Sequence, residues 1–215
     1  PVCNEVLTSI LVDKGINVVP NASLASVTEN SMSCPDGQQV GFDLMVTIPP
    51  HEGSQLIEDA DLGDGLGFGR TDRKTLKSTL AERVFLVGDN AGILGSKAGS
   101  VAHFQADTVV HNILREIAGQ EAEPCADGHT NCFIETGHGK AVLIDFNYDT
   151  QPVPGKFPMP VIGPMSLLKE TYLNHLGKLA FKHIYWNMLL PARPLPMVGS
   201  RMSVLGKQLH FADHR

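Results

Sequence analysis

The sequence predicts an α/β fold, because short apolar runs typical of strands alternate with longer segments of helical periodicity. Two apolar runs, residues 44–48 and 84–87, have the length and the valine content of buried strands. The clearest helical segment covers residues 99–117. With 42% hydrophobic residues, the 215-residue chain can form the core of one full domain or of two partial ones.

The first 53 residues are predicted to hold one helix followed by short strands. Apolar residues three to four positions apart predict a helix over residues 4–14, which Gly15 ends. The sequence Pro35-Asp36-Gly37 predicts a tight turn. The predicted strands, of which the second and third form a hairpin around that turn, are residues 16–19, 24–29, 31–34 and 39–48.

The middle of the chain is predicted to contain a strand, a sharp turn and a long helix. Residues 71–79 predict a short strand or turn that precedes the strand at 84–87. Gly88 then turns the chain, and Asp89 presents a carboxylate where open α/β sheets bind ligands. The N-terminus of the helix at 99–117 offers unpaired N–H groups to an anion. This combination suits a flavin, and it equally fits an ordinary strand–turn–helix in which Asp89 only caps the turn.

The last ninety residues are predicted to form a hairpin, a linker and a helix. Two apolar segments, residues 132–137 and 141–146, flank a glycine-containing turn and therefore predict a β-hairpin. Five prolines mark residues 152–164 as a linker. Helical spacing of apolar residues then covers residues 166–190, and the tail at 191–215 is expected to be irregular.

The net charge of −6 is unevenly distributed along the chain. Residues 166–215 carry seven basic and two acidic residues, a net charge of +5, whereas the remainder carries 10 basic and 21 acidic residues, a net charge of −11. An acidic body with a basic tail argues against a nucleic acid partner and favours contact with an anionic membrane surface. The four cysteines lack the paired spacing of a zinc site, so no metal site is predicted.

Residues 84–102 resemble the motif that closes the FAD-binding domain of flavoprotein reductases built from two dinucleotide-binding domains. That resemblance implies that Gly88 and Asp89 bind FAD, with the Asp89 carboxylate on the ribityl hydroxyls. It also implies that Lys97, with the amides of Ala98 and Gly99, faces the N1–O2 edge of the flavin and stabilises its reduced, anionic form. The Lys97-Ala98-Gly99 sequence narrows the resemblance to the sulfide:quinone oxidoreductase and flavocytochrome c sulfide dehydrogenase group.

The resemblance implies incomplete pieces of two Rossmann-like nucleotide-binding domains, followed by a C-terminal hairpin and an amphipathic helix. No Gly-x-Gly-x-x-Gly sequence follows a strand, and the glycines of residues 63–69 have the wrong spacing. We therefore expect the C-terminal half of a longer flavoprotein, as a processed product or a separate subunit, whose N-terminal half is a partner that carries the pyrophosphate motif. The expected boundaries are 1–53 for the end of the second, NAD-like domain, 54–83 for the crossover, 84–120 for the closing strand and helix of the FAD domain, 121–190 for the quinone and membrane region, and 191–215 for the tail.

Cys132 is the predicted catalytic residue, and this assignment depends on the resemblance. In the resembled family, a cysteine at the entry of this hairpin forms a redox pair with a second cysteine from the N-terminal half. Such a pair lets hydrosulfide attack a disulfide and lets a thiolate pass electrons to the flavin. Without the resemblance, Cys132 is more simply a structural or surface thiol, and Cys125 is the one rival.

The segment at 166–190 is predicted to be an amphipathic helix with Lys178 and Lys182 on its polar face. Its charges make a membrane-spanning position costly, so it lies either in the plane of a membrane surface or against its own domain. Residues 175–182 resemble the C-terminal membrane-attachment helix of sulfide:quinone oxidoreductases, which favours a peripheral membrane protein. Three aromatic residues are expected around a quinone, although each alone fits ordinary core packing: Phe133, Phe181 and either Tyr172 or Tyr185.

Taken with the resemblance, these features predict part of an enzyme that oxidises sulfide at a cysteine pair and passes electrons through FAD to a membrane quinone. A type II NADH:quinone dehydrogenase is an alternative that shares the fold and the membrane helix but has no need for Cys132. A flavocytochrome c relative has no need for the basic amphipathic helix. A third alternative is a structural fragment or subunit that is free of FAD on its own. Self-association into a homo-oligomer is a further expectation.

Overall fold

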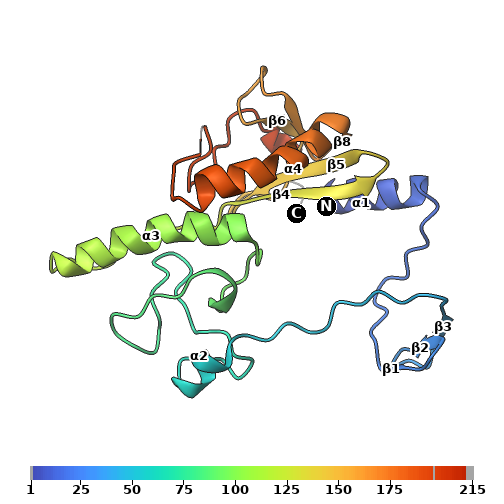
Figure 1. Ribbon diagram of the computed structural model, residues 1–215, viewed down its shortest axis with the longest axis horizontal. Helices are drawn as coiled ribbons and strands as arrows, with labels where there is room; N and C mark the ends of the chain where they lie inside the picture. Colours follow the sequence, from blue (N-terminus) through green and yellow to red (C-terminus); the bar gives the residue numbers. More distant parts are fainter. Residues whose placement is uncertain (1, 196, 212–215) are drawn as a thin grey trace. The chain divides into compact units, whose positions relative to one another are not determined.

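The structure is a computed structural model that describes residues 2–195 and 197–211 (Figure 1). The chain divides into two compact units, of which residues 8–51 form the smaller and residues 52–215 with the first seven residues form the larger. Each unit is described by itself. Helix α1 (Val2–Asp13) ends where Gly15 adopts a left-handed φ of 69°, which confirms the helix predicted over residues 4–14.

The smaller unit is built around an antiparallel three-stranded sheet. Its strands are β1 (Ser26–Val27), β2 (Ser31–Ser33) and β3 (Gln39–Gly41), in the order β1-β2-β3. The predicted turn at residues 35–37 is present, but it joins β2 to β3 and not β1 to β2. The predicted pairing of residues 24–29 with 31–34 is confirmed by the antiparallel pair β1–β2, but the turn at residues 35–37 was assigned to the wrong pair of strands.

One strand predicted in this unit is absent and another is shorter than predicted. Residues 16–19 have an extended or irregular backbone, and the predicted strand at 39–48 stops at Gly41. Leu44, Val46 and Ile48 are at least 80% exposed. A strand is stabilised by hydrogen bonds and side-chain pairs with its neighbours, and the described part of this unit offers these residues no partner strand.

The region between residues 52 and 98 has little regular structure but a small core. It contains helix α2 (Gln55–Asp59) and a 3₁₀ turn, η1 (Gly88–Asn90). Ile57, Leu86 and Ala91 form the buried cluster. The turn predicted at 71–79 is confirmed, because Thr71 pairs with Ser78 as an isolated bridge.

The strand predicted at residues 84–87 does not form in the structure. Only Phe85 makes an isolated bridge, to Lys77, and Val87 is exposed although Leu86 is buried. Parallel sheets are buried on both faces, so such a strand depends on neighbouring strands. The described residues supply none here.

Helix α3 (Gly99–Ile117) has the predicted bounds and buries one face. Val101, Phe104, Thr108 and Asn112 recur every three or four residues on that face. The Asn112 side chain donates to the carbonyl oxygens of Thr75 and Glu123, so it fixes the helix to two loops.

The C-terminal part contains a five-stranded sheet with one helix on it. The strands β4 (Thr130–Gly137), β5 (Lys140–Phe146), β7 (Met165–Leu167) and β6 (Gly155–Phe157) follow one another across the sheet, and β8 (Glu170–Thr171) also pairs with β5. The β4–β5 hairpin confirms the prediction, and positive φ angles at His138 and Gly139 suit its two-residue turn. Ala141, Val142 and Leu143 of β5 are fully buried and form the centre of the core.

Helix α4 (Tyr172–Ile184) lies along the β4–β5 hairpin and continues into a π-helical turn at Tyr185–Leu189 (Figure 1). It begins six residues later than predicted, because Met165–Leu167 and Glu170–Thr171 are held in the sheet as β7 and β8. The Thr171 hydroxyl accepts a hydrogen bond from the Asn174 amide and caps the helix. The predicted linker at 152–164 likewise contains a strand, β6.

The described part of the tail is irregular, as predicted, except for a 3₁₀ turn, η3 (Leu209–Phe211), and it is fixed to the sheet. Lys207 forms a bridge with Gly155, and Met202 is buried. Among the described residues there is no helix with both the length and the apolar character needed to cross a membrane.

Candidate functional site

The Gly88–Asp89 loop lies against the first turns of α3. Gly88 has a left-handed φ of 68°, and its amide donates to Gln105 Oε1 of α3 at 2.7 Å. Asp89 is exposed, and its carboxylate accepts no hydrogen bond from the described residues. Helix α3 begins after Ala98, so no side chain caps it, and its first turn has no acidic residue. The loop therefore presents a carboxylate beside the positive end of a helix dipole.

Lys97 holds this loop in place. Its ammonium donates to the backbone carbonyls of Asp89, at 3.0 Å, and of Ala91, and it lies 4.6 Å from the centre of the Phe68 ring. Burial lowers the pKa of Lys97, although the charges of Asp89 and Asp64 oppose that change. The ammonium of Lys97 thus donates to the loop itself. Its expected contact with a flavin stays a prediction.

Cys132 lies on β4, which has different surroundings on its two faces. Side chains alternate along a strand, so Asn131 and Phe133 share one face and Thr130 and Cys132 share the other. Thr130 lines a small hollow together with Gly88, Lys97 and Val101. Cys132 therefore belongs to the face that is directed towards the Gly88–Lys97 loop. Its thiol is free and half-buried.

The other face of β4 borders an apolar cavity of about 350 Å³. The floor of the cavity is formed by Phe133 of β4, and Phe181 and Gly177 of α4 form one wall. The remaining lining comes from α3, β4, β6 and the residue after it, β7, α4, the π-helical turn and the tail: Ser100, His103, Phe104, Asn131, Phe157, Pro158, Met165, Ala180, Ile184, Met188, Leu189, Leu195 and Val198. Ser100 Oγ donates to the Asn131 carbonyl at 3.0 Å, so the start of α3 is joined directly to β4.

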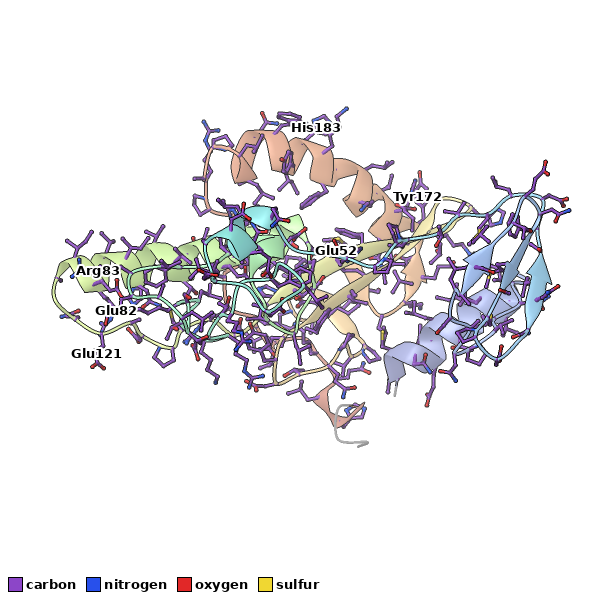
Figure 2. All side chains as sticks on the ribbon, turned by 90° about the horizontal axis from the view of Figure 1, so that it is seen from below. Glu52, Glu82, Arg83, Glu121, Tyr172 and His183 are labelled. Atoms are coloured by element: carbon purple, nitrogen blue, oxygen red, sulfur yellow. The ribbon has the colours of Figure 1, made fainter. Side chains whose placement is uncertain are left out.

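The structure brings Phe133 and Phe181 together as predicted neighbours, but not Tyr172. Tyr172 is 61% exposed at the start of α4, where its ring contacts the His175 ring, and it does not line the cavity (Figure 2). Sequence reasoning missed Gly177. Its signal was a glycine inside an amphipathic helix, four residues before Phe181, which often marks close packing.

A buried charged cluster was also missed. Asp145 Oδ1 lies 2.8 Å from His129 Nε2, and Asp145 Oδ2 accepts from Lys207 Nζ. The side chains of all three residues are at most 3% exposed. Burial alone raises the pKa of Asp145, but the hydrogen bond from His129 and the charge of Lys207 outweigh it and hold the pKa below its usual value. An acidic residue inside the otherwise apolar strand at 141–146 was the available signal.

The lowered pKa of Asp145 predicts sensitivity to acid. The pKa of Asp145 is lower in the folded protein than in the unfolded protein, where it is near 3.8. The ionised carboxylate therefore stabilises the fold above about pH 3.8, and this stabilisation is lost as the pH falls through the pKa of the folded protein. We expect acid unfolding, followed by circular dichroism, to show this loss below about pH 4. Asp145→Asn should be less stable at neutral pH and should lose that part of the pH dependence. An unchanged acid profile in the variant would contradict the assignment.

Comparison with solved structures defines the class of protein. The structure of the sulfide:quinone oxidoreductase from the bacterium Aquifex aeolicus matches 89% of this chain with a TM-score of 0.66, at 16% sequence identity and over 46% of its own length. A chain in the mitochondrial ATP synthase structure of Tetrahymena thermophila matches 66% of this chain with a TM-score of 0.56, at 23% identity and over 36% of its length. The chain therefore has an α/β fold that matches part of the fold of that oxidoreductase.

Comparison with curated proteins gives the family. A mitochondrial sulfide:quinone oxidoreductase of Schizosaccharomyces pombe is 32% identical over 148 residues, 68% of this chain, and one of Dictyostelium discoideum is 27% identical over 197 residues, 88% of this chain. This chain is related to the sulfide:quinone oxidoreductases, as the sequence resemblance predicted. It spans 32% and 42% of the length of these two relatives. No protein-family model matches the chain.

Proposed function

We propose that this chain supplies the closing part of the flavin site, one redox cysteine and the acceptor cavity of an FAD-dependent sulfide:quinone oxidoreductase. The observation that carries the proposal is the position of β4. One face of this strand carries Cys132 towards the Gly88–Lys97 loop, and the other face, through Phe133, borders the apolar cavity. A strand with a thiol on one face and an apolar cavity on the other fits an enzyme with separate donor and acceptor sites.

The loop and the start of α3 fit the polar edge of a flavin. The exposed Asp89 carboxylate, which no described residue occupies, suits hydroxyl groups, and the uncapped N–H groups at Gly99 suit a partial negative charge. Lys97 stabilises the loop that presents Asp89. FAD, when bound, would supply a carrier of two electrons between the sulfur and quinone sites. The pyrophosphate site is proposed to lie in an N-terminal part of the complete protein.

On the sulfur side, Cys132 is proposed to form a disulfide with a cysteine of that N-terminal part. Hydrosulfide attacks the disulfide, the S–S bond breaks, and the products are a persulfide on one cysteine and a thiolate on the other. The thiolate then holds the electron pair that leaves towards the flavin. The half-buried position of Cys132 shields this intermediate from water while leaving the thiol accessible from one face of β4.

On the acceptor side, the cavity is proposed to hold the ring of a quinone. Its lining is almost wholly apolar, and Phe133 and Phe181 provide flat surfaces for an aromatic ring. The same helix that forms one wall, α4, presents leucines and lysines outwards. Peripheral attachment to a membrane would therefore bring a lipid-soluble quinone to the cavity.

Filling the cavity should block quinone reduction selectively. A Cβ added at Gly177 would lie 2.9 Å from Met165 Sδ and 3.0 Å from Phe133 Cζ, so Gly177→Leu projects into the cavity past two side chains that can shift. We expect the complete protein with Gly177→Leu to lose quinone reduction by about 100-fold, which corresponds to about 2.7 kcal/mol. Reduction of its flavin by sulfide should be unchanged.

The control is Gly41→Leu, which adds the same side chain on β3, where only the Asn30 carbonyl lies within 4 Å. Steady-state quinone reduction and anaerobic flavin bleaching measure the two activities. If Gly177→Leu reduces quinone at the parental rate, the cavity is not the acceptor site.

A second candidate function is a structural subunit without its own catalysis. It is favoured by the match to a chain in the structure of a mitochondrial ATP synthase, because a similar fold then occurs in a large assembly. The two candidates differ in the native protein. A structural subunit would purify in a large complex, without flavin and without any effect of Cys132 on function. A type II NADH:quinone dehydrogenase, the remaining alternative, would bind flavin but would tolerate loss of Cys132.

A further inference from the structure

The ring of His129, in the buried cluster of His129, Asp145 and Lys207, faces a hydrogen-bond acceptor at each nitrogen. His129 Nδ1 lies 2.9 Å from the Gly199 carbonyl oxygen, and Nε2 lies 2.8 Å from Asp145 Oδ1. A carbonyl oxygen only accepts, and an ionised carboxylate only accepts. His129 therefore joins the Gly199 carbonyl of the tail to the Asp145 carboxylate of β5.

The cation of the cluster comes from the tail. Lys207 Nζ donates to Asp145 Oδ2 and, at 2.5 Å, to the Ser203 carbonyl. One buried carboxylate thus contacts both the Lys207 ammonium and the His129 ring. The His129 ring also stacks on Phe104 with 4.4 Å between ring centres and an interplanar angle of 1°. The Phe104 ring therefore covers one face of the His129 ring.

These contacts control where the tail lies. The His129 ring contacts the Gly199 carbonyl of the tail, and the Lys207 ammonium binds Asp145 eight residues further along the tail. The Lys207 backbone also pairs with Gly155 of β6. Val198, directly before Gly199, and Leu195 line the apolar cavity. Phe104, which stacks on His129, lines the same cavity. The charged cluster is therefore connected to the cavity through both the tail and α3.

We propose that His129, Asp145 and Lys207 form a buried ionic latch that seats the tail against the cavity and thereby sets the size of the acceptor site. These are positioning residues, because none of them lines the cavity itself. The proposal rests on the proposed function only in its second half, namely that the cavity is the site of the electron acceptor. The seating of the tail is independent of any ligand.

The test uses the complete protein with three variants. Lys207→Met keeps most of the side-chain length but removes the charge, and Lys207→Arg restores it. His129→Gln places an amide oxygen opposite one of the two acceptor oxygens and so breaks one contact. Lys156→Met is the matched control, because the Lys156 side chain lines the hollow beside the cluster but donates only to Ser166, at 3.3 Å, and the backbone hydrogen bond of Lys156 to Gly206 is preserved in the variant.

Hydrogen exchange measured by mass spectrometry reports on the latch without any quinone. We expect Lys207→Met and His129→Gln to raise exchange in residues 197–208 by about tenfold or more, because a buried charge without its partner favours local opening. The KM for a short-chain quinone should rise several-fold in the same variants, with sulfide-dependent flavin reduction unchanged. Lys207→Arg should recover most of both properties, and Lys156→Met should alter neither.

The outcomes separate the two parts of the inference. Unchanged exchange in residues 197–208 of Lys207→Met overturns the latch, whatever the kinetics show. Faster exchange with an unchanged KM overturns the connection between the latch and the acceptor site. If Lys207→Met does not fold, the double variant Asp145→Asn with Lys207→Met removes both charges together, and it must show the same faster exchange. Failure of the proposed function would appear separately, as a parental protein that does not reduce quinone with sulfide.

Discussion

Replacing Cys132 by serine is expected to abolish sulfide oxidation in the complete protein while FAD remains bound. Serine has nearly the same volume, but its hydroxyl stays protonated near neutral pH and cannot form the disulfide that hydrosulfide attacks. We expect sulfide-dependent quinone reduction to fall by at least about 100-fold, since loss of a covalent catalytic group typically costs this much or more. The measurement is the rate of quinone reduction at matched flavin content.

Cys125→Ser is the control for this experiment. Cys125 is also half-buried and free, but it lies in the loop before β4 and not on the strand that separates the two sites. Its backbone carbonyl accepts from Arg201, a contact that the substitution preserves. We expect near-parental activity. If Cys125→Ser is the inactive variant, or if Cys132→Ser retains most of its rate, the sulfur site is wrongly assigned and the NADH dehydrogenase alternative gains support.

Removing two positive charges from α4 is expected to weaken binding to anionic vesicles by about 30-fold. Each lysine near such a surface contributes about 1 kcal/mol, so Lys178→Gln with Lys182→Gln should cost about 2 kcal/mol. Both lysines are exposed, and His183 projects from the same helix away from the sheet (Figure 2). Exposed apolar side chains accompany them on α4 and the π-helical turn: Leu173, Leu176, Leu179 and Trp186.

A vesicle sedimentation assay with and without salt measures this effect. Binding of the parental protein should weaken as salt rises, because the Debye length is about 10 Å at 0.1 M. The matched control is Arg70→Gln with Lys74→Gln, which removes two exposed charges from a loop far from α4 in sequence. Equal loss of binding in both pairs would indicate a general charge effect, and no loss in the α4 pair would show that α4 acts only in packing.

The structure also changes the alternatives that the sequence left open for this helix. Gly177, Phe181 and Ile184 face the cavity, so one side of α4 packs on its own domain. The leucines listed above and the lysines lie on the remaining surface. One face of α4 therefore packs on its own domain, and contact of the other face with a membrane stays a prediction.

The elements that were predicted correctly are those with local signals. Helix α3 and the β4–β5 hairpin are defined by helical spacing and by a turn within a few residues, and both formed where predicted. The strands predicted at 16–19 and 84–87, and the part of the strand predicted at 39–48 that follows Gly41, failed for the opposite reason. A strand needs a continuous partner strand, and the described chain provides these segments with isolated hydrogen bonds only.

The candidate site was predicted only in part, for a similar reason. Phe133 and Phe181 were placed by resemblance, and the structure brings them into one cavity. The ion pair of Asp145 with Lys207 joins residues 62 positions apart, so the acidic residue in an apolar strand signals a buried charge but does not identify its partner. Tyr172 had the right chemistry but begins a helix whose start is set by the long-range pairing of β8 with β5.

The central claim is that β4 separates a sulfur site from an acceptor site, and rapid mixing of the complete protein tests it most directly. Flavin reduction by sulfide and flavin reoxidation by quinone are recorded separately for Cys132→Ser and Gly177→Leu. We predict that Cys132→Ser loses only the first reaction and that Gly177→Leu loses only the second. Loss of both reactions in either variant, or of the opposite reaction in each, would contradict the division of the two sites by this strand.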